Sequence, residues 1–540
     1  MSNSIIKFFK KLTKAINLSK ILLISIVILG LFLRWQKIDQ LVWEQEGNDE
    51  SRDMLVAEHI VNYQEEVLRG PLAAGGLDWL LNSPLYFYLI AAIWSITKDP
   101  LALMKVWATL MSLIPLIGYY IGKEIKNNQL GLIIALMLAI NIELIHESKQ
   151  LLQPFLLPFF STLFLWSLLK IEQQINYFYL SAAIFFLLVQ LHFHYGVLLI
   201  LPAGLILLGN YWLKLLKRDC SLINLAVPFL TASSIGVLWL LLTFRETVGD
   251  QFGFFLLNYS EKSDSIFTKL QEIGMGIVQM TFSWEVLFLA VPTLITLLTA
   301  AFFIKDKQID KTIKTISLLA GSVLLMIFSN GAIANTYLLA TLPYFIILIS
   351  IGLYKLIQLN SLLGLIFLII IPIKIYGLNQ YLTRSLIPET SFYKQKEIVA
   401  QQIYDDYFQT NQYKQPNFAL ASINFELPFD GWGTTAFWFH LEKMTNKKLT
   451  TLVNYGVNVK PLVNKADKIY LVCELRNSIK KNETKEKCLN LFIRARNYLE
   501  PGHPTLIFDS PNYAVWRFEI IEGTYQKNYN SVYPKALRFY

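Results

Sequence analysis

Four charged residues stand close together just after the first hydrophobic segment: Asp49, Glu50, Arg52 and Asp53. Residues three and four apart share one face of a helix, so Asp49, Arg52 and Asp53 would lie together at the start of a helix. A carboxylate beside a guanidinium has the chemistry of a general base next to a cation. Charges this dense beside a membrane are costly to keep near lipid unless they serve water, a ligand or each other.

The residues after this cluster predict an amphipathic helix. Asp49 is a natural N-cap residue. Apolar residues then recur at helical spacing: Met54, Ala57, Ile60, Val61, Val67 and Leu68. We therefore expect the charged cluster at the membrane surface, at the head of an interfacial helix. The alternative is that these charges only keep a loop solvated and cap its helix.

The rest of the chain predicts a polytopic membrane protein. Its 540 residues are 54% hydrophobic, and the mean hydropathy is +0.43. Apolar runs of roughly 17–25 residues, the length that crosses a bilayer, recur over most of the chain. The expected spans are 16–36, 100–122, 129–146, 150–170, 176–191, 193–213, 221–243, 284–304, 312–329, 335–357 and 360–379. The first is basic on its N-terminal side and lacks a cleavage site, which favours an uncleaved span.

The segment 84–97 is short for a span, and loop charge decides how to place it. If it does not cross, the loops near 123–126, 170–172, 214–219, 305–314 and 355 face the cytoplasm with 11 basic and 5 acidic residues. That arrangement satisfies the positive-inside rule, whereas a crossing segment would reverse it. We therefore predict eleven spans, a cytoplasmic N-terminus and an extracytoplasmic C-terminus. Segment 84–97 becomes an interfacial or re-entrant helix, and the long outer loops are 37–82 and about 244–283.

From about residue 384 the composition turns polar. Short β-like runs at 418–423, 469–474 and 513–520 alternate with helical stretches at about 430–445 and 485–496. These patterns predict a transmembrane domain at 1–383 and an extracytoplasmic α/β domain at 384–540. With the interfacial segment 84–97 included, the first outer loop of the transmembrane domain is 37–99. Two alternatives stay open for Cys473 and Cys488, a disulfide or two free thiols.

The charge and the cysteines exclude other classes of protein. The net charge of +9 fits cytoplasmic loops that face anionic lipid, and no basic-aromatic motif indicates nucleic acid. No Cys/His spacing indicates a zinc site.

Several short motifs resemble one group of membrane enzymes. Asp49-Glu50-Ser51-Arg52 resembles the Asp-Glu-x-Arg signature of bacterial aminoarabinose transferases and their relatives, and the protein O-mannosyltransferases share its acidic pair. Further matches follow in order: Ser83-Pro84-Leu85-Tyr86-Phe87-Tyr88, Gln153-Pro154-Phe155-Leu156-Leu157-Pro158, Gln190-Leu191-His192 and Tyr337-Leu338-Leu339…Pro343. The resemblance covers about residues 20–380 and implies the GT-C fold. Many relatives have Lys-Pro-Pro where this chain has Asn82-Ser83-Pro84, so their lysine contact to the donor is not carried over.

The resemblance also implies a reaction. Relatives move a sugar from a polyprenyl phosphate, so this chain is expected to transfer a hexosyl or pentosyl group to an acceptor glycan, lipid or protein, with inversion, at the outer face of the cytoplasmic (inner) membrane. By match, Asp49 is the base and Arg52 contacts the phosphate. Glu50 and Asp53 either hold these two residues in place or bind a divalent metal ion.

Three further residues are candidates for substrate binding: Tyr86, His192 and Lys374. Tyr86 and His192 lie in matched motifs, and a histidine satisfied within the fold is the alternative for His192. Lys374 lies near the outer end of the last expected span, where a charge usually has a partner.

Two other classes of function stay open. A transporter or flippase for lipid-linked glycans would favour charges at mid-membrane and repeat symmetry, whereas the charges here cluster in outer loops. A non-catalytic assembly protein of a surface-glycan pathway would not need the intact Asp49 and Arg52 pair.

Overall fold

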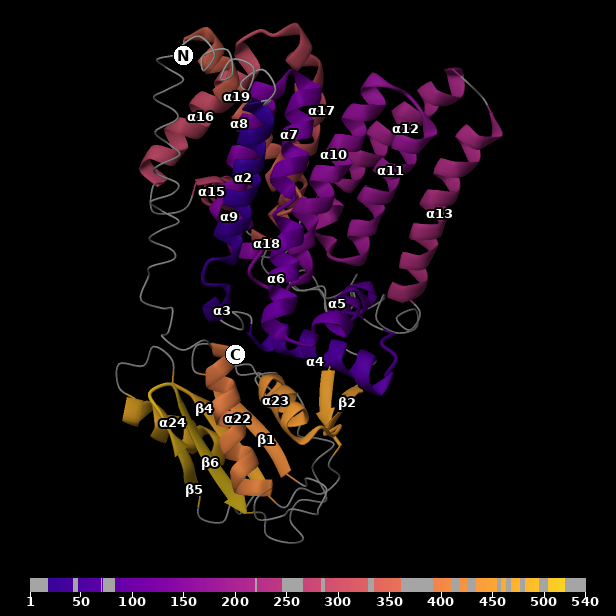
Figure 1. Ribbon diagram of the computed structural model, residues 1–540. Coiled ribbons are helices and arrows are strands. Elements are labelled where there is room, and N and C mark those ends of the chain that lie inside the picture. The colour runs from indigo at the N-terminus through magenta and orange to yellow at the C-terminus, as the bar shows by residue number, and fades with distance from the viewer. Residues whose placement is uncertain are drawn as a thin grey trace, which may run out of the picture. The chain divides into compact units, whose positions relative to one another are not determined.

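The computed structural model describes residues 18–41, 47–68, 70, 83–218, 221–244, 266–282, 287–328, 335–360, 392–408, 418–424, 434–453, 458–462, 468–475, 481–494 and 504–519. Internal contacts divide the chain into two compact units (Figure 1). The first comprises residues 1–38, 69–86 and 101–386, and the second comprises 39–68, 87–100 and 387–540. The second unit therefore combines most of the segment that carries the charged cluster with the polar C-terminal segment.

The first unit is helical. Its α-helices are α2 (Leu18–Trp35), α6 (Pro100–Met111), α7 (Ile114–Ile125), α8 (Asn128–Ala139), α9 (Ile142–Glu147), α10 (Leu157–Gln173), α11 (Tyr177–Leu188), α12 (Leu201–Arg218), α13 (Leu222–Phe244), α15 (Ile266–Phe282), α16 (Leu287–Phe303), α17 (Lys307–Gly321), α18 (Asn335–Leu338) and α19 (Leu342–Leu359). Short 3₁₀ helices join them: η1 (Gln153–Leu156), η2 (Val189–His192), η3 (Tyr195–Leu199) and η5 (Ser322–Phe328).

Five helical stretches in the described residues are long and apolar enough to cross a membrane: Leu18–Trp35, Pro100–Ile125, Gln153–Gln173, Leu222–Trp239 and Leu342–Leu359. Shorter apolar helices are Leu85–Thr97, Asn128–Ala139, Tyr177–His192 and Val291–Phe303. The polytopic class is confirmed, and the count of eleven spans stays a prediction, since the span expected at 360–379 lies outside the described residues. The outer loop expected at about 244–283 contains the helix α15, and its place outside the membrane stays a prediction.

Close helix packing in this unit depends on glycine. A Cβ atom on Gly122 of α7 would lie only 2.6 Å from the Cα atom of Gly131 in α8. Gly118 lies one turn before Gly122, on the same face of α7, and a Cβ there would meet the side chain of Leu138. Small residues at such spacing let two membrane helices approach closely, and α2, α7 and α8 pack together here (Figure 1).

Four of the five loops that were predicted to share the cytoplasmic face are joined by ion pairs in the helical unit. Lys126 in the first of these loops pairs with Asp306 at 3.1 Å, and Lys355 pairs with Asp310 at 2.9 Å. Lys170 pairs with Glu124. These contacts join loops near 124–126, 170, 306–310 and 355. The grouping agrees with the charge argument, whereas the identity of this face as cytoplasmic stays a prediction.

The second unit contains helices and two sheets. Its helices are α3 (Ile38–Leu41), α4 (Gly47–Tyr63), α5 (Leu85–Thr97), α22 (Phe392–Phe408), α23 (Thr435–Thr445) and α24 (Lys481–Arg494), with α3 and α5 beginning at the border of the first unit. Its strands are β1 (Phe418–Asn424), β2 (Thr450–Val453), β3 (Asn458–Pro461), β4 (Lys468–Glu474), β5 (Thr505–Asp509) and β6 (Tyr513–Glu519). The α/β expectation is confirmed, and sequence analysis missed α22, β2, β3 and β5.

The main sheet has the strand order β1-β4-β6-β5. Strands β1 and β4 are parallel, with Phe418 opposite Lys468, whereas β6 is antiparallel to both β4 and β5. Strand β4 is buried on both faces, which explains its nearly continuous apolar run. One face packs on α24, and the other meets α22 and α23, where Phe418 stacks on Trp438 with ring centroids 5.2 Å apart.

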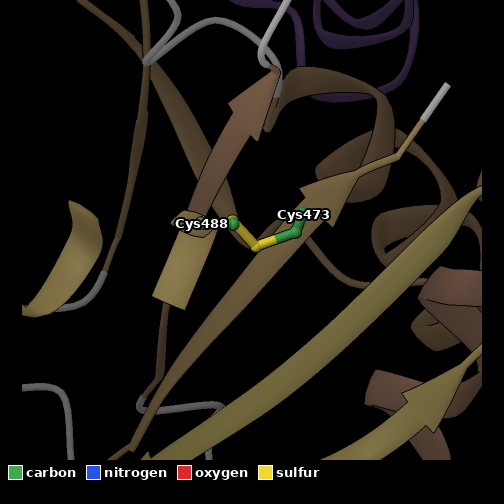
Figure 2. Close-up of a disulfide and its surroundings, with 2 residues drawn as sticks. All are labelled: Cys473 and Cys488. Carbon is green, nitrogen blue, oxygen red and sulfur yellow. A yellow bond between two sulfur atoms is a disulfide. The ribbon is translucent and has the colours of Figure 1, made fainter. Parts of the chain in front are cut away.

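A disulfide ties β4 to α24 (Figure 2). It joins Cys473 to Cys488, whose Cα atoms lie 6.2 Å apart, and both residues belong to the buried core of this sheet. Of the two alternatives that the sequence left open, the structure contains the disulfide.

Candidate functional site

The charged cluster lies in the first turns of α4. The helix begins at Gly47, so the expected N-cap role of Asp49 was wrong, since Asp49 lies inside the first turn. Its carboxylate still lies at the positive end of the helix dipole, together with that of Glu50. The helix ends at Tyr63, and Gln64 follows with φ of 54°, a left-handed conformation that commonly ends helices.

Arg52 joins the acidic residues of the cluster, as helical spacing predicted. Its Nη1 atom lies 2.6 Å from Oδ1 of Asp49. Its Nη2 and Nε atoms lie 2.6 Å and 2.8 Å from Oδ1 of Asp53. One guanidinium therefore holds two carboxylates of the same helix, and the mutual geometry of all three side chains is fixed.

Exposure separates the members of the cluster. The side chain of Asp49 is 36% exposed, whereas that of Arg52 is 3% exposed and that of Asp53 is fully buried. Asp49 is thus the carboxylate that a dissolved or membrane-borne reactant can reach. Arg52 and Asp53 lie behind it as a buried pair that keeps a cation next to it.

The helix is not amphipathic in the expected sense. Every residue from Ser51 to His59 is buried, including the charged ones. The apolar run Met54–Ala57 covers all sides of one turn, and the polar residues on either side of it find partners inside the protein. The expected separation of apolar and polar sides was wrong, because partners elsewhere in the chain satisfy polar residues of α4 and bury them as well.

His59 is the centre of a second group of charges on the same helix. Its Nδ1 atom lies 2.8 Å from Oε2 of Glu65, and its Nε2 atom lies 2.9 Å from Oε2 of Glu442 in α23. Glu442 also accepts hydrogen bonds at Oε1 from the backbone N–H groups of Leu449 and Thr450 and from the Thr450 hydroxyl. Both ring nitrogens of His59 therefore face carboxylates.

The charges in this group shift one another's pKa values. Burial alone would lower the pKa of His59, but its hydrogen bonds to Glu442 and Glu65 outweigh burial and raise it to about 9. Burial and the nearby charge of Glu442 raise the pKa of Glu58 to about 7. Burial would also raise the pKa of Glu65, but hydrogen bonds from His59 and Lys448 outweigh burial and lower that pKa to about 2. His59 is therefore a buried imidazolium at neutral pH.

Two predicted binding residues lie in the helical unit. The hydroxyl of Tyr86, a fully buried side chain, donates to the backbone oxygen of Leu151 at 2.7 Å. The Nδ1 atom of His192 lies 3.0 Å from Oγ of Ser83, and its Nε2 atom lies 3.4 Å from the oxygen of Ile235. This geometry favours the alternative in which His192 is satisfied within the fold.

The remaining predicted residues add little to the site. Lys374 lies outside the described residues. Glu50 is buried at the start of α4. Among the residues that the structure describes, no group of three His, Cys, Asp or Glu side chains could hold a metal ion. The divalent ion considered for Glu50 and Asp53 therefore gains no support from the described side chains.

Other buried cations of the helical unit have structural partners. Arg34 in α2 donates to the oxygens of Leu138 and Ala139 at the C-terminal end of α8, where the helix dipole favours a cation. Lys149 donates to the backbone oxygen of Gln36 at 2.9 Å.

Sequence analysis missed His59 and its partner Glu442. A single histidine in a helix with polar neighbours carries no motif, and the partner lies 383 residues further along the chain. The pair Ser51 and Thr435, whose hydroxyl oxygens lie 2.8 Å apart, was missed for the same reason. The only local signal was Glu65, six residues after His59.

Comparison with known proteins gives the fold. No protein family profile and no curated protein matches this chain. The chain resembles the crystal structure of ArnT from Cupriavidus metallidurans in the apo state, with a TM-score of 0.55, 13% identity and coverage of 92% of this chain and 97% of that one. It also resembles ArnT from the same organism bound to undecaprenyl phosphate, with a TM-score of 0.53, 12% identity and the same coverage. The fold is that of the GT-C glycosyltransferases, as the sequence motifs implied.

Proposed function

We propose that this GT-C-fold chain is an inverting glycosyltransferase of a bacterial cytoplasmic membrane, which moves a hexosyl or pentosyl group from a polyprenyl phosphate to an acceptor. The observation that carries the proposal is the exposed carboxylate of Asp49, held by buried Arg52 in the first turns of α4. The similar ArnT structure is bound to undecaprenyl phosphate, which is a polyprenyl phosphate like the carrier lipid of the donor proposed here.

The side chains supply the chemistry of the attacking group. Asp49 accepts the proton of an acceptor hydroxyl while the hydroxyl oxygen forms a bond to the anomeric carbon of the sugar. The bond between that carbon and the phosphate oxygen breaks, and the electron pair leaves with the polyprenyl phosphate. Attack opposite the leaving group inverts the anomeric configuration. The carboxylate acts in its ionised form, and the Arg52 guanidinium at 2.6 Å holds its Oδ1 atom in place.

Arg52 is proposed to have two roles, one toward the base Asp49 and one toward the departing phosphate. Its contacts with Asp49 and Asp53 position the base. Its positive charge also favours negative charge that develops on a departing phosphate nearby. The match to the family assigns it the phosphate contact, and its burial indicates that orienting Asp49 is the larger part of its role.

The proposed location of the reaction is the outer face of the membrane, with the N-terminus in the cytoplasm. The disulfide between Cys473 and Cys488 supports this orientation, because disulfides persist in oxidising compartments and are rare in the cytosol. The acceptor is proposed to be a glycan, lipid or protein on that side.

The test uses membranes that contain the full chain and labelled polyprenyl-phosphate sugars, one hexose and one pentose. We compare the wild type with Asp49→Asn, which removes the base and keeps the shape. Asp509→Asn is the matched control, because Asp509 is also an exposed, ion-paired aspartate of the second unit. Transfer that is lost in Asp49→Asn alone supports the proposal. Equal transfer by wild type and Asp49→Asn removes Asp49 as base, and no transfer by the wild type favours a transporter or an assembly protein.

A further inference from the structure

The helix that carries the proposed base is held at two points by α23 of the same unit. Near its start, the hydroxyl oxygens of Ser51 and Thr435 lie 2.8 Å apart. Two turns later, Nε2 of His59 lies 2.9 Å from Oε2 of Glu442. The two contacts are eight residues apart on α4 and seven apart on α23, so the two helices run in the same direction with a fixed register.

We propose that His59 is a positioning residue for sugar transfer, which, through its ion pair with Glu442, fixes α4 and the Asp49, Arg52 and Asp53 cluster that it carries. The inference rests on the function proposed above. His59 lies ten residues after Asp49, which is about 15 Å along a helix. It therefore acts through the helix and not on the reactants.

Glu442 is itself firmly held. Its Oε1 atom accepts hydrogen bonds from Leu449 N, Thr450 N and Thr450 Oγ1 at 2.9, 2.7 and 2.7 Å. These residues lead into β2, so the carboxylate is fixed by α23 and by the strand that follows it. A histidine that binds such a carboxylate takes its position from the C-terminal segment, and α4 takes its position from the histidine.

Glu65 is the second carboxylate that contacts the ring of His59. Glu65 binds Nδ1 of His59 and pairs with Lys448, which stands between α23 and β2. Helix α4 ends at Tyr63, and the N–H of Glu65 donates back to the oxygen of His59 at 3.3 Å, which turns Glu65 toward the ring. The chain thus places a carboxylate on each side of one imidazolium.

The energetics favour a role in positioning over a role in general stability. A buried ion pair adds little net stability compared with apolar residues of the same volume, because both charges lose their hydration. Breaking one is costly, however, since the remaining charge is left buried. Such pairs are best attested as devices that select one register, and the register of α4 sets where Asp49 stands.

The matched control is another buried ion pair of the same unit. Lys396 in α22 lies 3.8 Å from Glu474 at the end of β4, and their side chains are 2% and 4% exposed. Neither residue is part of α4. Lys396→Met and Glu474→Gln therefore break a buried pair outside α4 and leave the side chains of His59 and Glu442 unchanged.

The experiment compares full-length His59→Ala and Glu442→Gln with these controls in detergent. Hydrogen exchange of the peptide that covers 47–63 reports on the helix, and kcat and donor KM report on transfer. We expect exchange at least tenfold faster, kcat at least tenfold lower and KM within about twofold of wild type in both test variants. The control variants should change none of the three. Glu442→Gln keeps the shape of the side chain, so it covers the case in which His59→Ala does not fold.

Three outcomes contradict the inference or its premise. Unchanged exchange in both test variants overturns it, whatever the activity. Faster exchange with unchanged kcat overturns it as well, because the helix would then be loosened without effect on the base. A wild type that transfers no sugar overturns the proposed function, and the exchange measurement still decides whether the pair holds α4.

Discussion

The Nη1 atom of Arg52 lies 2.6 Å from Oδ1 of Asp49, and this contact ties an exposed carboxylate to a buried cation. Asp53 shares the same guanidinium from the buried side. The cluster therefore has a reachable end and a fixed end, which is what a general base needs if it is to meet a hydroxyl in one orientation.

Replacement of Arg52 by lysine should separate its two proposed roles. Lysine keeps the charge but cannot hold Asp49 and Asp53 with separate nitrogens in one plane, so kcat should fall by about 10²-fold with donor binding nearly kept. Arg52→Glu should weaken binding of a polyprenyl phosphate more than binding of the acceptor. The control is Arg517→Lys, whose arginine pairs with Asp406 at 2.6 Å. Full activity in Arg52→Lys would show that Arg52 does not orient the base.

The stability of the second unit should depend on pH through His59. Its pKa of about 9 in the folded chain lies above the ordinary value of 6.5, so the folded state binds more protons between these values. The stability that protonated His59 adds is complete below pH 6.5 and is lost as pH rises to about 9. The titratable groups that face it are Glu58, Tyr63 and Glu65 beside it in sequence, and Glu442 of the C-terminal segment. Lys443 acts on Glu58, and Lys448 acts on Glu65.

Thermal unfolding of the wild type and of His59→Ala, measured from pH 5 to pH 10, checks this dependence. The difference in midpoint should be largest at or below about pH 6.5 and should shrink toward pH 9. Glu58, whose pKa is raised to about 7, should weaken the wild type further as pH rises from 4.5 to 7. A difference in midpoint that does not vary with pH would contradict the charged state assigned to His59.

Much of this site could be predicted from the sequence, because its charged residues lie close together along the chain. The contacts that were missed join residues that are far apart in the sequence. Asp49, Arg52 and Asp53 are three and four residues apart, so helical geometry alone brought them together. The contact between His59 and Glu442 spans 383 residues, and no local pattern indicates it. The start of the helix was wrong by three residues, because Asp49 fits an N-cap and an N-terminal first turn equally well.

In the fold, too, local sequence patterns predicted many helices and strands but not the contacts between distant segments. Apolar runs indicated most of the membrane helices, and β1, β4 and β6 were predicted from their alternating or continuous apolar residues. The helix α15 was missed because the polar residues Lys269, Gln271 and Glu272 interrupt its apolar pattern. The assignment of α4 to the unit of the C-terminal segment depends on tertiary contacts, which periodicity does not contain.

The disulfide should contribute to the stability of the C-terminal segment. It joins residues 15 apart in the sequence, and closing a loop of that length stabilises a fold by about 3 kcal/mol. Cys473→Ser together with Cys488→Ser should lower the free energy of unfolding by about that amount, measured by denaturant unfolding of the purified chain. Cys220→Ser, which leaves the disulfide intact, is the control. An unchanged unfolding free energy in the double variant would show that the bond is not formed in the purified protein.

His192 should matter less for transfer than its sequence motif indicated. Its two nitrogens already meet Ser83 Oγ and Ile235 O, so the ring has structural partners. His192→Asn should lower kcat/KM by less than tenfold, and Ser83→Ala should have a similarly small effect. The check is transfer from a polyprenyl-phosphate sugar by both variants. A loss above about 10²-fold in His192→Asn, with the fold intact, would give His192 a direct part in the reaction.

The central claim is that Asp49 takes the proton of the acceptor. The most direct measurement is the rate of transfer from a labelled polyprenyl-phosphate sugar by Asp49→Asn beside the wild type, with donor binding measured on the same preparations. The account predicts a rate lower by about 10² to 10⁴-fold in Asp49→Asn, with donor binding retained. Transfer at the wild-type rate by Asp49→Asn would contradict it.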